Sequence, residues 1–202
     1  MKEHPLPLMP DMVRAYYEDR KSQTRRVIAP QRTDESGWLY HDRGNKVYAV
    51  RGDMTGAGMR TFLNACPYGQ VGDRLWIREA LVRLGNYVTY THDGAVIQRD
   101  GKPILWPWKV GKLASRYMPY WACRSWAELV AVRVEQVQNI SEADAIAEGT
   151  CVDPERCAPY YQERGVHRRR FEKLWDSINE PRGYGWASNP WVWVLTFKRI
   201  AE

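Results

Sequence analysis

The sequence predicts an α+β protein built on a mostly antiparallel β-barrel, with short flanking helices at the barrel openings and with loop insertions. Three observations support this fold class. Strand-like segments outnumber helix-like segments, no strand–helix–strand rhythm appears, and no helical pattern is long. The chain of 202 residues has the size of one domain. We therefore expect a single domain over 1–202, with insertions at about 31–65 and 83–112.

The elements expected in the first half are a helix from Pro10 to about 20–21, a strand over 24–28, a hairpin over 38–50 and a strand from Arg74. Met12, Ala15 and Tyr16 repeat at helical spacing, which predicts the helix. Pro30 stops the first strand, and Gly44-Asn45 is typical of a hairpin turn.

The strand from Arg74 alternates in a way that bears on function. Leu75, Ile77 and Glu79 share one face of this strand, because side chains alternate between the two faces. Glu79 therefore continues an apolar row. A carboxylate in such a position lies at the mouth of a barrel or half buried.

The elements expected in the second half are a hairpin of 87–91 with 95–98, loops over 100–120, a strand over 128–137, helices over 141–149 and 166–179, and a strand over 191–199. In the 128–137 strand, Val130, Val132 and Val134 should share one face. Ser141 and Gly149 suit the two ends of the first helix. The last strand is apolar on both faces, which predicts a central position in the sheet.

Composition and charge favour a polyanionic partner. Thirty Lys and Arg against 24 Asp and Glu give a formal charge of +6 and a pI near 9.2. Ten Trp and twelve Tyr against three Phe is an unusual ratio of aromatic residues. Cationic groups interleaved with such rings bind unpaired bases. An alternative interpretation is that the bulky rings fill a small barrel.

Cysteine and histidine positions predict no metal site. Cys66, Cys123, Cys151 and Cys157 show no CxxC spacing, and no second close pair completes a site around Cys151, Cys157 and His167. We expect no cofactor, reduced thiols and a cytoplasmic protein. The four histidines show no pairing and are expected at the surface. We also expect no signal peptide and no membrane partner, because no apolar stretch is long enough to span a bilayer.

The segment DRKSQTRRVI, residues 19–28, is the strongest candidate for chemistry. Lys21 and Thr24 flank the expected junction from helix to strand, and a threonine hydroxyl needs a base to become a nucleophile. Arg20, Arg25 and Arg26 are neighbouring cations, and such cations lower the pKa of a lysine. The simpler interpretation is a basic helix end that complements the helix dipole.

Three segments, MVRAYYEDRKSQTRRVI, CPYGQVGDRLWIREA and LWDSINEPRGYGWASNPWVWVLTFKRI, together resemble the ASCH-domain proteins of phages and prophages. The resemblance spreads over roughly 10–30, 66–82, 115–149 and 171–199. It implies a PUA-like β-barrel with flanking helices, and it implies a link to RNA or modified nucleobases.

One branch of that family hydrolyses N-acetylated cytidine to cytidine and acetate, with the motif R-K-x-x-T and a later Glu. The matching residues here are Arg20, Lys21, Thr24 and Glu79. By resemblance, Thr24 is the nucleophile, Lys21 its base and Glu79 the acid–base partner. This chain is about twice as long as that branch, and the triad could instead be a retained binding site for a base.

Further ligand contacts are expected outside the triad. By resemblance, the segment holding Ser115, Tyr120, Trp121 and Arg124 lies beside the pocket. Arg78 could line a nucleic-acid face or form the polar exterior of its strand. Tyr184 and Trp186 could stack on a base or cover the barrel end.

The function expected first is an amidohydrolase that deacylates N-acylated cytidine, as a nucleoside or within a polynucleotide. The alternative is a non-catalytic module that binds RNA or a modified base. A ribonuclease ranks below both. The expected partner is thus a nucleoside or a single-stranded nucleic acid, RNA before DNA, and the sequence leaves the oligomeric state open.

Overall fold

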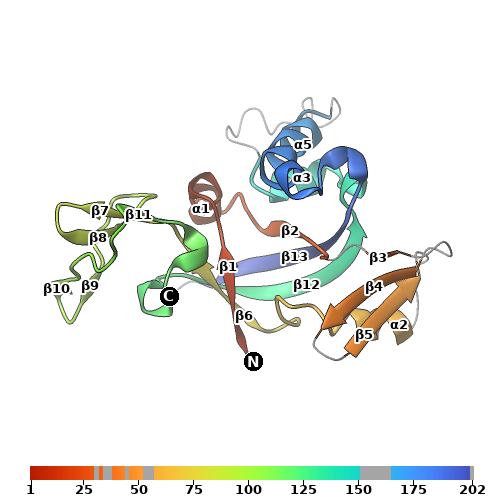
Figure 1. Ribbon diagram of the computed structural model, residues 1–202, viewed down its shortest axis with the longest axis horizontal. Helices are drawn as coiled ribbons and strands as arrows, with labels where there is room; N and C mark the ends of the chain where they lie inside the picture. Colours follow the sequence, from red (N-terminus) through yellow and green to blue (C-terminus); the bar gives the residue numbers. More distant parts are fainter. Residues whose placement is uncertain (30–31, 34–37, 44–45, 52–56, 151–164, 201–202) are drawn as a thin grey trace.

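The computed structural model describes residues 1–29, 32–33, 38–43, 46–51, 57–150 and 165–200. Its centre is a five-stranded sheet in the order β1-β6-β12-β13-β2 (Figure 1). The strands are β1 (Glu3–Pro7), β6 (Arg74–Arg78), β12 (Trp126–Gln136), β13 (Trp191–Ile200) and β2 (Gln23–Val27). All neighbours pair antiparallel except β1 with β6, which pair parallel.

The expected closed barrel is not found among the described strands. The sheet keeps two hydrogen-bonding edges, β1 and β2, so the α+β class holds while the barrel is open. Arg26 of β2 nevertheless reaches the opposite edge, where its Nη2 donates to the carbonyl oxygen of Pro7 at 2.7 Å. Pro5 and Pro7 lack backbone N–H groups, which suits β1 to an edge position. Because of these prolines, the sequence pattern does not predict β1.

The core of the sheet follows the predicted alternation on β6. Leu75, Ile77 and Glu79 are buried, and the residues between them are half-buried. β13 lies between β12 and β2, as its two apolar faces predicted. The prediction that Val130, Val132 and Val134 share one face of β12 is wrong. A register shift between Leu129 and Ala131 interrupts the alternation and leaves Val130 exposed.

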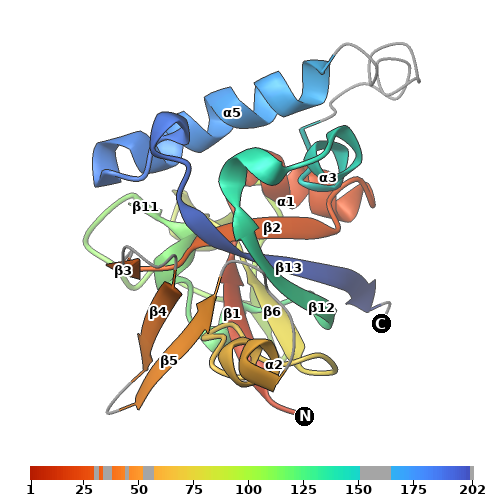
Figure 2. The same cartoon turned by 90° about the vertical axis from the view of Figure 1, so that its right-hand side faces the viewer.

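Several of the described helices pack against the sheet. α1 (Pro10–Tyr17) ends sooner than expected, whereas α3 (Glu142–Ala147) and α5 (Val166–Asn179) match the predicted segments. Ser141 caps α3, since its Oγ accepts from the backbone N–H of Asp144 at 3.0 Å. Figure 2 shows α5 lying across one end of the sheet, above α1, α3 and β2. His167 of α5 is fully buried, so its expected surface position is wrong.

The chain after β6 forms a separate lobe. Its strands are β7 (Leu81–Leu84), β8 (Tyr87–Tyr90), β9 (Gln98–Arg99), β10 (Lys102–Pro103) and β11 (Lys112–Leu113). The expected hairpin partner of β8 is reduced to one bridge between Thr89 and Val96. The lobe has its own small core around Leu81, Val88 and Met118. It projects at one end of the longest axis of the molecule (Figure 1).

The expected hairpin over 38–50 is present. β4 (Trp38–Arg43) pairs antiparallel with β5 (Lys46–Arg51), β3 (Arg32–Thr33) joins β4, and α2 (Ala57–Leu63) follows. Short 3-10 turns complete the fold at Ser115–Tyr117, Tyr120–Ala122, Val137–Asn139, Glu180–Arg182 and Trp186–Ser188. No helix in the described ranges is long and apolar enough to cross a bilayer.

Candidate ligand-binding site

A cavity lies where the two edges of the sheet approach one another beneath α5. It encloses about 170 Å³, which is below the roughly 300–1,000 Å³ of pockets for drug-sized ligands. Its walls come from the end of β1, from α1, β2 and α5, and from the turn after α3. The cavity lining includes Lys21, Thr24, Arg25, Arg26, Tyr68, Glu148, Leu174, Trp175, Ile178 and Arg182.

Lys21 lies in this cavity wall but has no free donor. Its Nζ donates to the carbonyl oxygens of Gln23 and Glu148, both at 2.7 Å, and to Oε2 of Glu148 at 2.9 Å. An ammonium group has three N–H donors, so all three are used. Burial lowers the pKa of Lys21, and the Glu148 carboxylate opposes this shift by its charge and its hydrogen bond.

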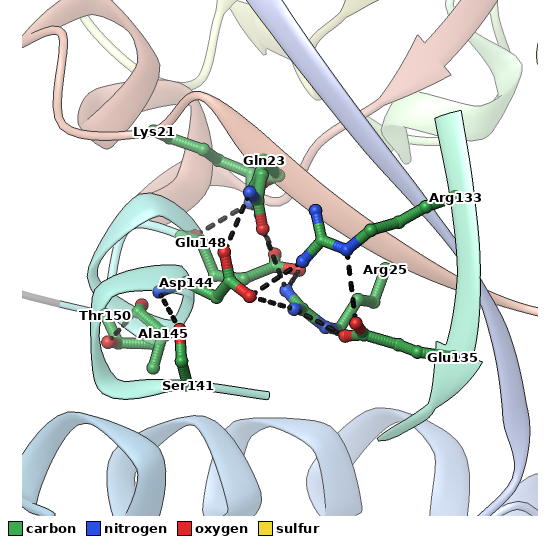
Figure 3. Close-up of polar contacts among 10 residues, drawn as sticks. All are labelled: Lys21, Gln23, Arg25, Arg133, Glu135, Ser141, Asp144, Ala145, Glu148 and Thr150. Carbon is green, nitrogen blue, oxygen red and sulfur yellow. Dashed lines mark hydrogen bonds and ion pairs between the residues drawn. The ribbon is translucent and has the colours of Figure 1, made fainter. Parts of the chain in front are cut away.

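Arg25 completes a buried ionic network around Lys21 (Figure 3). Its guanidinium donates to Glu135, Gln23, Glu148 and Asp144 at distances between 2.7 and 3.2 Å. We use the name ionic network for Lys21, Arg25, Arg133, Glu135, Asp144 and Glu148. Three cations face three carboxylates, so the network has no net charge. Both Lys21 and Arg25 are therefore held as structural ions.

Gly149 allows the network to form. Its φ of +87° is in the left-handed region, and a Cβ there would lie 2.9 Å from Cβ of Ala15 and 3.2 Å from Cβ of Lys21. Only glycine fits this close approach without displacing α1 or the lysine stem. The residue before it, Glu148, forms an antiparallel bridge with Lys21. The helix end predicted from Gly149 thus also positions the partner of Lys21.

The Thr24 side chain differs from those of Lys21 and Arg25 in its hydrogen bonding. It is on β2 opposite Leu195, it is buried, and it lines the cavity. Within the described part of the chain, its hydroxyl has no hydrogen-bond partner. This hydroxyl is therefore available to a ligand.

Arg26 and Arg182 are the uncompensated charges of the cavity. Arg26 Nη2 bonds to Pro7, and its Nε is buried without a hydrogen-bond partner. Arg182 Nη1 donates to the side-chain oxygen of Asn179 at 3.2 Å. Among the described residues, neither guanidinium has a carboxylate partner. The cavity therefore combines an apolar wall with positive charge, which suits a ring that carries an anionic group.

The helix α5 contributes the apolar wall. Phe171 and Trp175 are buried in the core and also line the cavity, together with Leu174 and the partly exposed Ile178. The sequence identified this face from its spacing but did not distinguish core from cavity wall. Arg182 and Glu148 were missed altogether. The sequence carries no periodic signal for either residue.

Glu79 does not join Lys21 and Thr24. Its carboxylate accepts from Nε and Nη2 of Arg124, at 2.8 and 2.7 Å, and from the Tyr17 hydroxyl at 3.0 Å. It is not among the lining residues of the cavity. Met12 and Tyr17 lie about 140° apart around α1, so the helix presents Met12 to the cavity and Tyr17 to Glu79. The expected triad is therefore divided between two sides of α1.

Arg124 acts as a clamp between the sheet and the lobe. We use the name arginine clamp for Glu79, Arg124 and Asp93, since Arg124 Nη1 also donates to Asp93 at 2.7 Å. Its guanidinium lies 3.6 Å from the ring centroid of Tyr90. Burial works against the charged form of Arg124, but the two carboxylates outweigh it and raise the pKa.

The other expected contacts are scattered over the surface. Arg20 pairs with Glu18 and lines a separate shallow depression. Arg78 donates twice to the carbonyl oxygen of Met118, at 3.0 and 2.6 Å. Tyr184 and Trp186 follow α5 in the chain, and Trp186 folds back alongside the helix, where its ring packs against Phe171 and lies 5.2 Å from the guanidinium of Arg168. None of these side chains lines the cavity.

The segment expected beside the pocket belongs to the lobe side of the molecule. Ser115 is half-buried, Tyr120 donates to Glu3 at 2.7 Å, and Trp121 is 38% exposed. These side chains do not line the cavity either.

The cysteines give no metal centre in the part of the chain that the structure describes. Cys151 and Cys157 lie outside the described residues, and no cluster of potential metal ligands occurs among the residues that are described. Comparison of the chain with protein-family models, curated proteins and solved structures finds no match in any of the three.

Proposed function

We propose that this protein is a binding module whose cavity takes one unpaired pyrimidine base together with a phosphate group. The observation that carries the proposal is the pair of uncompensated arginines, Arg26 and Arg182, at a small cavity walled by aromatic and aliphatic side chains. A planar ring fits the apolar wall, and a phosphate satisfies the guanidinium groups. Thr24 adds a hydroxyl that can read a polar edge of the base.

RNA is the favoured source of this base. Sequence-specific binding to RNA targets unpaired bases that stack on side chains and bond through their edges. A cavity of about 170 Å³ has room for one such ring and not for a duplex. The resemblance to ASCH-domain proteins agrees with this ligand class.

The experiment compares cytidine 5′-monophosphate with cytidine by titration calorimetry. We expect the nucleotide to bind more tightly, because a charge-assisted hydrogen bond contributes about 1.5–3 kcal/mol. Arg182→Gln should remove most of this advantage, and Arg26→Gln should do the same if urea unfolding shows that the variant stays folded. Arg60→Gln, at an exposed position of α2 outside both the cavity and the lobe, is the matched control.

Equal affinity for nucleotide and nucleoside would remove the arginines from the proposal. Failure of either molecule to bind would reject the cavity as a base site.

A second candidate is the amidohydrolase acting on N-acetylated cytidine. Its support is the Thr24 hydroxyl, which lines the cavity beside Lys21 and has no partner among the described residues. It ranks second because a lysine base needs a free lone pair, and the three N–H groups of Lys21 are all donated. Glu79 is also held elsewhere by Arg124.

The test is turnover of N4-acetylcytidine by the intact protein and by Thr24→Val. Turnover that Thr24→Val abolishes, with the cavity still able to bind cytidine monophosphate, would place hydrolysis ahead of binding. No turnover by the intact protein would leave the binding module as the function.

A further inference from the structure

The lobe is strongly basic. Residues 81–124 hold seven Lys and Arg against two Asp, a net of +5 in a protein whose formal charge is +6. Arg124 is neutralised by the arginine clamp. The remaining cations are Arg83, Arg99, Lys102, Lys109, Lys112 and Arg116, and all six are exposed. Among the described residues, none of the six forms an ion pair.

The charges are placed against one another without compensation. In the β9–β10 hairpin, Lys102 lies directly opposite Arg99 in the antiparallel register. Like charges at opposite positions of a strand pair destabilise the pairing. Asp100, in the turn between them, forms no ion pair with either cation in the described structure. A polyanion bound at this hairpin would relieve the repulsion.

Aromatic rings are exposed among these cations. Tyr117 is 63% exposed, Tyr120 is 52% exposed and Trp121 is 38% exposed. The Trp121 ring stacks near Trp108, with centroids 6.2 Å apart and an angle of 9° between the planes. Arg99 lies 5.8 Å from the centroid of Trp121, and Arg116 lies 5.6 Å from that of Tyr117. At two points of the lobe, therefore, a cation lies beside an exposed ring.

We propose that this lobe binds a single-stranded nucleic acid, with exposed rings stacking on bases and the six cations contacting phosphates. Unpaired bases stack on aromatic side chains with little regard to sequence, and a basic groove or face follows the backbone. An acidic protein partner would account for the exposed cations of the lobe, but it would not account for the aromatic rings that are exposed beside them. A duplex hides its base faces, so it would use the charges without the rings.

This surface is distinct from the cavity, and the proposal does not depend on the function proposed for the cavity. The six cations and the exposed rings are absent from the cavity lining. Figure 1 shows α1 between the lobe and α5, which covers the cavity. The lobe would bind a strand, whereas the cavity would read a single base.

The experiment measures binding of a labelled oligouridylate by fluorescence anisotropy over a range of salt concentrations. The oligonucleotide is about 15 nucleotides long, near the upper end of site sizes for single-strand-binding domains. The test variant changes Lys102, Lys109 and Lys112 to Gln. The matched control changes Lys2, Lys173 and Lys198 to Gln, which removes the same charge from exposed positions outside the lobe.

We expect the intact protein to bind at low salt, and the lobe variant to lose at least tenfold in affinity. The slope of log affinity against log salt should fall by about 2, because each phosphate contact to a single strand contributes about 0.7. The control variant should keep most of the affinity and slope. Equal losses in the two variants, or no binding by the intact protein, would overturn the proposal.

The contribution of the rings is tested with Trp121→Ala and Tyr117→Ala. Removal of one stacking ring should weaken oligouridylate binding by roughly tenfold. Tyr117 is the more exposed ring, so its variant keeps the test valid if Trp121→Ala is found unfolded by circular dichroism. Unchanged affinity in a folded variant, or equal competition by polyglutamate or by a duplex at matched charge, would show a surface that recognises charge alone.

The outcome is separable from that of the cavity. The lobe variant should bind cytidine monophosphate as the intact protein does, and Arg182→Gln should bind oligouridylate with its salt slope retained. Loss of nucleotide binding in the lobe variant would contradict the assignment of two separate sites.

Discussion

The ionic network beside β2 and the arginine clamp beside β6 both hold buried carboxylates, but they differ in how much of each lies in water. In the network, the side chains of Lys21 and Arg25 are 2% and 0% exposed. In the clamp, the Glu79 side chain is 1% exposed, Arg124 is 26% exposed and Asp93 is 40% exposed. The two central cations of the network are therefore closed to water, and only its outer member Arg133 is 39% exposed, whereas the central cation of the clamp is itself partly hydrated.

This difference separates structural charge from available charge. Every N–H of Lys21 and Arg25 already has an acceptor, so a ligand could recruit them only by breaking bonds of the fold. Arg26, adjacent to Arg25 in sequence, is the reverse case, because its charge has no partner within the described residues. The position of a cation within a basic segment of the sequence thus does not indicate whether it is available to bind a ligand.

The largest expected effect comes from opening the network. Glu148→Gln should lower the free energy of unfolding by about 3–5 kcal/mol, because it leaves two buried cations without their shared carboxylate. Urea unfolding followed by tryptophan fluorescence measures the change. Glu128→Gln, at an exposed position of β12, is the control and should stay within about 0.5 kcal/mol of the intact protein. A loss below about 1 kcal/mol for Glu148→Gln would show that the network is not a closed structural unit.

Opening the clamp should cost less. Arg124→Met leaves Glu79 with the Tyr17 hydroxyl as its remaining side-chain partner, and we expect a loss of about 2 kcal/mol. The loss is smaller because Arg124 is already partly hydrated. The double variant Glu79→Gln with Arg124→Met should recover part of the loss. A cost equal to that of Glu148→Gln would remove the contrast between the two clusters.

The smallest expected effect is on stability in acid. Burial would raise the pKa of Asp144, but the Gln23 hydrogen bond and the charges of Arg133 and Arg25 lower it overall. A carboxyl with a lowered pKa stabilises the folded state above its unfolded pKa of about 3.9, and the stabilisation is lost as pH falls through the folded value. Asp144→Asn should therefore flatten the decline in urea midpoint below about pH 4.

Asp93→Asn provides the comparison within the clamp. Burial also opposes ionisation of Asp93, and the Arg124 hydrogen bond lowers its pKa overall. Its side chain is 40% exposed, so solvent screens the interaction and the flattening should be weaker than in Asp144→Asn. The same series of urea midpoints, measured from neutral pH into the acid range, gives both results. A stronger flattening in Asp93→Asn would reverse the order that burial predicts.

Much of the fold could be read from local patterns. The spacing of Phe171, Leu174 and Trp175 gave the bounds of α5, and the alternation of Leu75 and Ile77 gave the faces of β6. The same alternation placed Glu79 in an apolar row, and the structure buries this carboxylate more deeply than the half-buried position expected. These patterns succeed because a helix or a strand repeats every few residues, so the residues of one buried face recur at a regular spacing in the sequence.

The candidate site could be predicted in part only. Lys21 and Thr24 line one cavity, as their spacing suggested, but Glu79 belongs to a different cluster. The expected barrel is also open, with β1 and β2 as its edges. Neither the sheet closure nor the position of Glu79 has a local signature.

The sequence by itself determined the α+β class, the main helices and strands, the place of Glu79 in an apolar row and a basic chain rich in Trp and Tyr. Tertiary structure alone decided that Lys21 pairs with Glu148 across 127 positions, and that Arg124 takes Glu79 across 45. The physical reason is that ion pairs have no periodicity. Any of 30 cations could meet any of 24 carboxylates, and only the packing of distant segments selects the partners.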